Sequence, residues 1–235
     1  MAEPFPTRHD YADAEALAAA LADAVAMRLR SGIDARGAAS LALSGGRTPG
    51  RFFAALSGAE LDWARVSVTL VDERWVPADH ERSNEGFLRR GLLQNKAAAA
   101  AFIGLVNEAA TPEDGAPAIA ARIAALPLPF DAVVLGMGGD GHTASFFPGG
   151  DRLAEALDPD TKALVLPMRA EGAGEPRITL TLPVVAAARA VYLHIEGAEK
   201  AVVLETALGS GPAEDLPVRA VLRHPAAAPE VFWCP

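Results

Sequence analysis

Short, uninterrupted apolar runs alternate along this chain with amphipathic segments of helix length. Runs such as "SLALSGG" (40–46), "VSVTLVDE" (66–73) and "FDAVVL" (130–135) are apolar at successive positions rather than at every second one. Strands of this kind are buried on both faces, as in a parallel sheet that helices cover on each side. The sequence therefore predicts an α/β fold, with a Rossmann-like, mostly parallel sheet and helices on both faces.

The remaining segments continue this alternation. An amphipathic helix is expected over 12–30, where leucine or valine recurs at every fourth position from Leu17 to Leu29. The other expected elements are helices over 48–56, 83–93, 112–125 and 198–208, strands over 162–168, 177–183 and 190–197, and a short strand or tail over 228–235. Thr48 is the expected N-cap of its helix, with Pro49 in the first turn. Because no repeat or low-complexity linker divides the chain, residues 1–235 are predicted to form one domain.

Composition and charge narrow the class of protein. Hydrophobic residues make up 51% of the chain, which supports a sizeable core. The formal net charge is −9 and no long Lys/Arg stripe is present, which argues against nucleic-acid and membrane-surface partners. The longest uncharged apolar stretch, Ala97 to Val106, is too short to span a bilayer, and the N-terminus lacks a signal-peptide pattern. The single cysteine, Cys234, fits a reducing compartment, so a cytoplasmic protein is expected.

The loops that follow strands are the places to look for a site, because open parallel sheets bind ligands at the carboxyl ends of their strands. Four such loops carry glycines or charged side chains. They are "SGGRTPG" (44–50), "DERWVPADHERSN" (72–84), "GMGGDGHTASFFPG" (136–149) and "GAEK" (197–200).

The loop at 136–149 contains glycines at the spacing G-x-G-x-x-G, as in dinucleotide-binding loops. That motif should open directly into a helix, whereas Pro148 and two glycines follow here, and Asp140 would repel a pyrophosphate. The glycines fit better as a tight turn that presents Asp140 and His142 together. An aspartate that accepts a hydrogen bond from one ring nitrogen leaves the other nitrogen as a base. A surface turn in which the aspartate caps a backbone amide is the alternative.

Two other loops carry groups suited to an anion. The turn of Ser44, Gly45 and Gly46 lies between a strand and a helix, so its N–H groups and hydroxyl can bind an anion, although a simple connection has the same pattern. It is not a P-loop, because no Lys-Ser/Thr follows the glycines. In "DER" (72–74), Arg74 can pair with a phosphate or carboxylate, and a solvated charged turn is the alternative.

The other histidines give no second pattern. His80 lies in a polar loop, and His9, His194 and His224 have no evident local partners, so structural or exposed positions are expected. Histidines and acidic residues lack the spacing of a metal site, and no metal is expected. Neither G-x-S-x-G nor a cysteine–histidine pair indicates a covalent nucleophile.

Taken in order, the four loops resemble those of the 6-phosphogluconolactonases, which share a larger group with the glucosamine-6-phosphate isomerases (deaminases). The resemblance covers nearly the whole chain and is carried by "LSGGRTP", "VDERWVP" with the following "SN", "LGMGGDGHTASFFPG", "RITLTLP" and "GAEK". It implies a sheet-centred α/β fold, no cofactor, and hydrolysis of 6-phospho-D-glucono-1,5-lactone to 6-phospho-D-gluconate. This reaction is the second step of the oxidative pentose phosphate pathway. The implied partner is the small phosphorylated lactone, with neither nucleic acid nor membrane, and the expected state is a monomer or weak homo-oligomer.

The resemblance also implies roles for particular residues. His142 is the expected base, oriented by Asp140, and Asp72 joins them as a catalytic candidate because the deaminases have an aspartate there. The groups expected to hold the phosphate are Ser44, Gly45, Gly46, Arg74, Arg177 and Lys200. Deaminase relatives have matching residues at Ser44, Arg177 and Lys200, whereas Arg74 is the lactonase-type addition. Arg47 lies where the family varies and is left out.

Two alternative functions stay open: a deaminase-type enzyme, and a non-catalytic sugar-phosphate sensor on the same fold. The deaminases carry a glutamate a few residues after Asp-Gly-His, where this chain has "TASFFPG" without an acid, and this difference favours the lactonase. A sensor would keep the phosphate cluster and lose the acid–base pair. The presence of both Asp140 and His142 therefore argues against a sensor.

Overall fold

A seven-stranded parallel sheet forms the centre of the molecule in the computed structural model, which describes residues 6–46 and 48–235. The strand order is β1-β10-β9-β6-β2-β3-β5. The strands are β1 (Thr7–Asp10), β2 (Ala39–Leu43), β3 (Val66–Leu70), β5 (Ala101–Ile103), β6 (Ala132–Leu135), β9 (Val191–Glu196) and β10 (Glu230–Cys234). β2 and β6 are buried at every residue, as their continuous apolar sequences predict.

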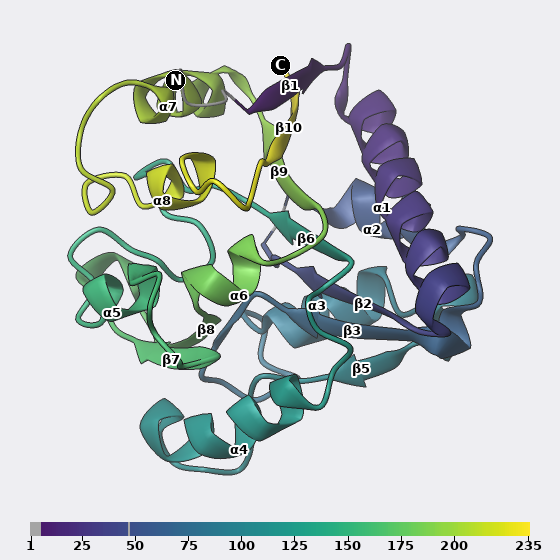
Figure 1. Ribbon diagram of the computed structural model, residues 1–235, viewed down its shortest axis with the longest axis horizontal. Helices are drawn as coiled ribbons and strands as arrows, with labels where there is room; N and C mark the ends of the chain where they lie inside the picture. The colour runs from purple at the N-terminus through teal and green to yellow at the C-terminus, as the bar shows by residue number, and fades with distance from the viewer. Residues whose placement is uncertain (1–5, 47) are drawn as a thin grey trace.

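Helices cover both faces of this sheet (Figure 1), so the predicted fold class is confirmed. On one side α1 (Ala14–Arg36) packs against α2 (Gly50–Ser57), and on the other α7 (Ala198–Leu208) contacts α8 (Val218–Leu222). The other helices are α3 (Asn84–Gly91), α4 (Pro112–Ala124), α5 (Leu153–Leu157) and α6 (Leu182–Ala186), with short 3₁₀ turns at Trp63–Arg65, Asn95–Ala99 and Glu171–Ala173.

A second, antiparallel sheet was not predicted. The run 66–73 divides between the two sheets, because β4 (Asp72–Arg74) leaves the parallel sheet and pairs with β8 (Arg177–Leu180). β8 pairs in turn with β7 (Val165–Met168), which gives the order β4-β8-β7. Val71 joins the two sheets: its N–H donates to the Leu43 carbonyl, and its carbonyl accepts from the Leu180 N–H. The chain thereby carries Asp72 and Arg74 away from the end of β3.

The start of α2 also differs from the prediction. The helix begins at Gly50 with Pro49 rather than Thr48 as its N-cap, and no side-chain capping hydrogen bond is present among the described residues. Proline suits this position because it has no N–H that would need a partner at a helix start. Thr48 instead lines the cavity described below. Arg47, in the same loop, lies outside the described residues.

β2 and β6 are neighbours at the point where the chain changes its direction across the sheet. After β2 it continues to β3 and β5 on one side, and after β6 it continues to β9 and β10 on the other. Such a switch point leaves a crevice at the carboxyl ends of the strands. Ser44 and Gly136 follow the two strands there, and the Gly136 N–H donates to Ser44 Oγ at 3.1 Å.

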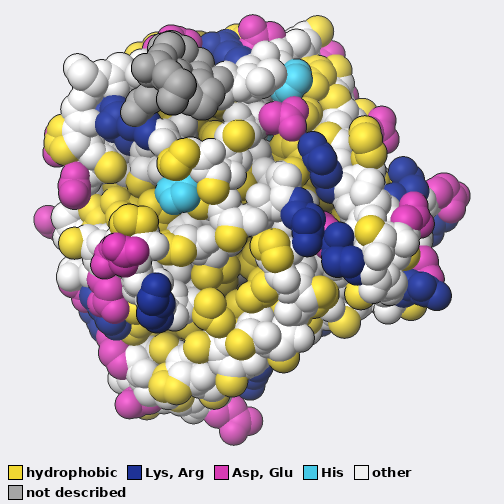
Figure 2. Space-filling view, in the orientation of Figure 1, with side chains coloured by type: hydrophobic (Ala, Val, Ile, Leu, Met, Phe, Trp, Pro, Cys, Tyr) yellow, Lys and Arg dark blue, Asp and Glu magenta, His cyan; other side chains and the backbone are white. Residues whose placement is uncertain are grey.

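The surface shown in Figure 2 carries acidic and basic side chains interspersed with apolar ones. Of the helices in the described ranges, none is both long and apolar enough to cross a membrane.

Candidate active site

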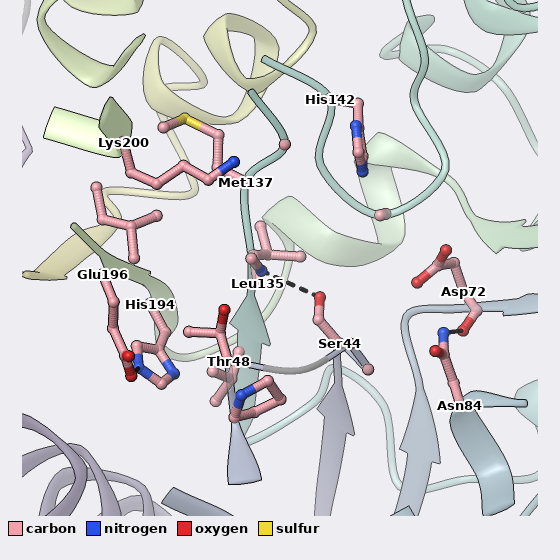
Figure 3. Close-up of a pocket in the computed structure, with 18 of the residues that line it drawn as sticks. Ser44, Thr48, Asp72, Asn84, Leu135, Met137, His142, His194, Glu196 and Lys200 are labelled. Atoms are coloured by element: carbon pink, nitrogen blue, oxygen red, sulfur yellow. Dashed lines mark hydrogen bonds and ion pairs between the residues drawn. The ribbon is translucent and has the colours of Figure 1, made fainter. Parts of the chain in front are cut away.

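A cavity of about 410 Å³ lies where the loops after β2, β6 and β9 meet the segment that follows β3 (Figure 3). The predicted site residues that line it are Ser44, Gly45, Gly46, Asp72, Arg74, His142 and Lys200. Asp140 does not line the cavity but contacts His142, and Arg177 is buried beside Asp72. Residues from all four of the predicted loops therefore meet at one cavity.

The turn after β6 holds Asp140 and His142 as a hydrogen-bonded pair. Asp140 Oδ1 lies 2.6 Å from His142 Nδ1 and also accepts a hydrogen bond from the His142 N–H at 3.1 Å. The side-chain hydrogen bond from His142 lowers the pKa of the Asp140 carboxyl to about 2, although partial burial opposes this shift. The pair therefore stabilises the fold above the ordinary carboxyl pKa, and this contribution is lost as the pH falls through about 2. The His142 ring borders the cavity, and its Nε2 has no hydrogen-bond partner within the described chain.

The turn requires glycine at position 138, because a side chain there would collide with the Asp–His pair. A methyl group at Gly138 would overlap both the imidazole of His142 and the carboxylate of Asp140. The Gly138 N–H closes the turn by donating to the His142 carbonyl at 2.8 Å. No helix opens directly from the loop, since the next one, α5, begins at Leu153. The geometry therefore favours the interpretation of this loop as a turn that holds the Asp–His pair, rather than as a pyrophosphate-binding loop.

Phe147 packs against the imidazole of His142. Its ring centroid lies 4.5 Å from that of His142, and the side chain is buried. The guanidinium of Arg177 lies 5.3 Å from the same phenyl ring. An apolar ring in this place restricts the orientation of the histidine and excludes water from one of its faces.

Asp72 forms a buried part of the cavity wall. Ser145 Oγ donates to Asp72 Oδ2 at 2.6 Å, and a guanidinium nitrogen of Arg177 lies 3.7 Å from the same oxygen. Arg177 also donates to the Ala173 carbonyl at 2.6 Å. Burial lowers the pKa of the Arg177 guanidinium, and the charge of Asp72 opposes this shift. Arg177 therefore does not itself line the cavity in this structure but contacts Asp72, which does.

Arg74 and Lys200 bring positive charge to the cavity. The Arg74 guanidinium donates to the Arg82 carbonyl, and its Nε is buried without a hydrogen-bond partner in the described part of the chain. Lys200, in the first turn of α7, makes no ion pair within residues 6–46 and 48–235, and its amine extends toward Met137 (Figure 3). Both side chains are available to an anion. Among the described residues, no cluster of histidine, cysteine and acidic side chains could hold a metal ion.

Comparison with known proteins decides the family. A family model described as glucosamine-6-phosphate isomerases/6-phosphogluconolactonase matches residues 12–233. The chain belongs to this family. It is 52% identical to a 6-phosphogluconolactonase of Rhizobium meliloti, over 97% of this chain and 98% of the relative, and 52% identical to one of Mesorhizobium japonicum, over 96% and 94%. The crystal structure of a 6-phosphogluconolactonase from Shewanella baltica has a TM-score of 0.96 and 42% identity, with 99% of both chains covered.

Glu73 separates the two cavity residues Asp72 and Arg74 of this family member, but it faces the protein interior. Its carboxylate accepts hydrogen bonds from the N–H groups of Arg74, Asn84 and Glu85 and from the Ser83 hydroxyl, at 2.7 to 3.1 Å. Burial raises the pKa of Glu73, and the three N–H groups oppose that shift. Glu73 thus anchors the start of α3, and the solvated charged turn is wrong for this residue.

We expect Glu73→Ala to lower the free energy of unfolding by about 2 kcal/mol, because buried N–H groups at the start of α3 lose their acceptor. Urea unfolding followed by circular dichroism measures the change. Glu81→Ala is the matched control, since Glu81 is an exposed acid in the same loop, and its effect should stay within about 0.5 kcal/mol. Equal unfolding midpoints for Glu73→Ala and the wild type would contradict this role.

Four polar residues that line the cavity were not predicted as site residues: Thr48, Asn84, His194 and Glu196. The Asn84 amide donates to the Asp72 carbonyl at 3.0 Å, and its side chain fills the space next to Gly45 that any larger residue there would need. The sequence signal for Asn84 was its place in the "SN" motif that follows "VDERWVP". His194 Nε2 lies 3.0 Å from Glu196 Oε1, so the expectation that His194 has no local partner is wrong. Residues two apart on a strand share a face, so the sequence "HIE" already indicated that His194 and Glu196 lie side by side.

Proposed function

We propose that this chain hydrolyses 6-phospho-D-glucono-1,5-lactone to 6-phospho-D-gluconate. The observation that carries the proposal is a hydrogen-bonded Asp140–His142 pair at a cavity that also presents Arg74, Lys200 and the turn after β2. The Asp140–His142 pair suits hydrolysis at a carbonyl group. The positive charges of Arg74 and Lys200 suit binding of a phosphate. The relatives that bear the name 6-phosphogluconolactonase, similar over nearly their full length, support the same reaction.

His142 is the proposed general base. Its free Nε2 takes a proton from a water molecule as the water oxygen bonds to the lactone carbonyl carbon, while Asp140 accepts from Nδ1. The bond from this carbon to the ring oxygen then breaks, and the imidazolium returns the proton to the departing oxygen. Asp140 stays ionised throughout, because its pKa is about 2, and stabilises the imidazolium. The reaction consumes only water, so the proposal includes neither a metal nor a cofactor.

Anionic oxygens of the substrate are proposed to bind at the turn after β2. Several amides of the other glycine loop already have partners: Gly136 donates to Ser44, and Gly138 to His142. The N–H groups of Gly45 and Gly46 have none within the described residues, and both glycines line the cavity. These N–H groups can donate to the phosphate or to the developing oxyanion.

The phosphate is proposed to bind to this turn together with Arg74 and Lys200. Arg177 then acts on the substrate indirectly, by fixing Asp72. The Asp72 atom Oδ2 is used by Ser145, whereas Oδ1 has no hydrogen-bond partner in the described chain. Asp72 is therefore proposed to accept a hydrogen bond from a sugar hydroxyl through Oδ1.

We expect the purified protein to hydrolyse 6-phosphogluconolactone and to release no appreciable ammonia from glucosamine 6-phosphate. The reason is that a buried phenyl ring, Phe147, lies against His142 in the segment where the resemblance places an acid in deaminases. Both substrates are assayed with the same preparation, the first by lactone loss and the second by coupled ammonia detection. Deamination at a turnover comparable to lactone hydrolysis would overturn the proposed reaction.

A further inference from the structure

Glu196 places a carboxylate in the same cavity as Lys200, the proposed phosphate ligand. Glu196 ends β9, and Lys200 follows in the first turn of α7. β10 fixes the turn between them: the Gly197 N–H donates to the Cys234 carbonyl at 2.9 Å, and Trp233 Nε1 donates to the Gly197 carbonyl at 3.0 Å. The backbone thus holds an acid and a base close together at the cavity wall, where they would be expected to pair.

The two side chains nevertheless point in different directions. Figure 3 shows Lys200 extended toward Met137, whereas the carboxylate of Glu196 is turned toward the ring of His194. His194 Nε2 lies 3.0 Å from Glu196 Oε1, and no ion pair joins Glu196 to Lys200 within the described residues. Two acids among the described residues line the cavity, Asp72 and Glu196, and the one that lies beside the turn leading to Lys200 is held by a histidine.

His194 is well suited to hold the carboxylate in one place. The residue is 4% exposed, and Phe52 of α2 packs edge-on against the ring with centroids 6.2 Å apart. Burial lowers the pKa of His194, and Glu196 opposes that shift. A neutral imidazole with its proton on Nε2 can donate to Glu196 while its ring stays packed in the core.

We propose that His194 is a positioning residue that keeps the Glu196 carboxylate away from Lys200 and so leaves the ammonium free for the phosphate of the substrate. This inference rests on the proposed phosphate site. Without His194, Glu196 would be free to pair with Lys200, and an incoming phosphate would have to displace it. Removing the charge of Glu196 should then reverse the defect.

The test measures the Kd of inorganic phosphate by calorimetry for the full chain and its variants. His194→Leu should weaken binding about fivefold, the factor expected when a partly exposed ion pair competes with the ligand. His194→Leu combined with Glu196→Gln should return the Kd to within about twofold of the wild type. His194→Gln is the matched control: its amide can donate from about the position of Nε2, and the Kd should not change. In steady-state assays of the lactone, His194→Leu should raise KM and leave kcat unchanged.

Lys200→Ala separates failure of the inference from failure of the phosphate site. Unchanged phosphate binding by Lys200→Ala would overturn the proposed phosphate site and this inference together. Weaker binding by Lys200→Ala with wild-type binding by His194→Leu would overturn the inference alone. A defect in His194→Leu that Glu196→Gln does not restore would also overturn it, because it would show a purely structural role. If His194→Leu does not fold, His194→Asn, whose amide is too short to reach Glu196, takes its place in the same comparison.

Discussion

His142→Ala should lower kcat for lactone hydrolysis by roughly 10²- to 10⁴-fold, the loss typical for removal of a general base. The variant should still fold, because the residue lies on a loop and a third of its side chain is exposed, although it loses the stabilising hydrogen bond to Asp140. The measurement is the rate of 6-phosphogluconolactone loss, corrected for spontaneous ring opening, beside a urea unfolding curve of the same variant. Near-normal turnover would show that another group activates the water.

Asp140→Asn is the companion to this variant and separates orientation from base chemistry. An asparagine carbonyl can still accept from Nδ1 but carries no charge to stabilise the imidazolium, so kcat should fall, by less than for His142→Ala. A loss equal to or greater than that of His142→Ala would show that the charge of Asp140 is as important as the base itself.

Lys200→Ala and Arg74→Ala should each reduce kcat/KM for the phosphorylated lactone by roughly 10- to 100-fold relative to unphosphorylated gluconolactone. This range corresponds to the 1.5 to 3 kcal/mol of a hydrogen bond to a charged group. The net charge of −9 repels a dianionic substrate, so binding requires a concentrated local positive field. The measured quantity is the ratio of the two specificity constants in each variant.

Lys162→Ala controls for the loss of one positive charge, because Lys162 is exposed and lies outside this cavity. Its ratio of specificity constants should match that of the wild type. If the ratio is also unchanged in Lys200→Ala and Arg74→Ala, these two residues do not hold the phosphate.

The sequence predicted those parts of the fold and site that depend on local pattern. Continuous apolar runs identified the central strands, and the four loops that carry glycines or charged side chains follow strands of this kind, so the switch-point rule located the cavity. The pair Asp140–His142 was predictable for the same reason, since two residues in one tight turn need no distant contact to meet.

The parts that were missed depend on contacts between distant segments. β1 and β5 are short edge strands, and their neighbours in the sheet rather than their own sequences make them strands. The division of the run 66–73 at Val71 is set by its bonds to Leu43 and Leu180. The contact of Asp72 with Ser145 likewise joins positions 73 residues apart, which no local pattern reveals.

Lactone hydrolysis by this chain is tested most directly by the rate at which the purified protein opens 6-phosphogluconolactone. Lactone loss is followed with wild-type protein, with His142→Ala at the same concentration, and in buffer alone. We expect lactone loss to be much faster with the wild type than with either the variant or the buffer. If lactone loss is no faster with the wild type than in buffer, in a protein that still binds phosphate, the chain is not a lactonase and is better described as a sugar-phosphate sensor.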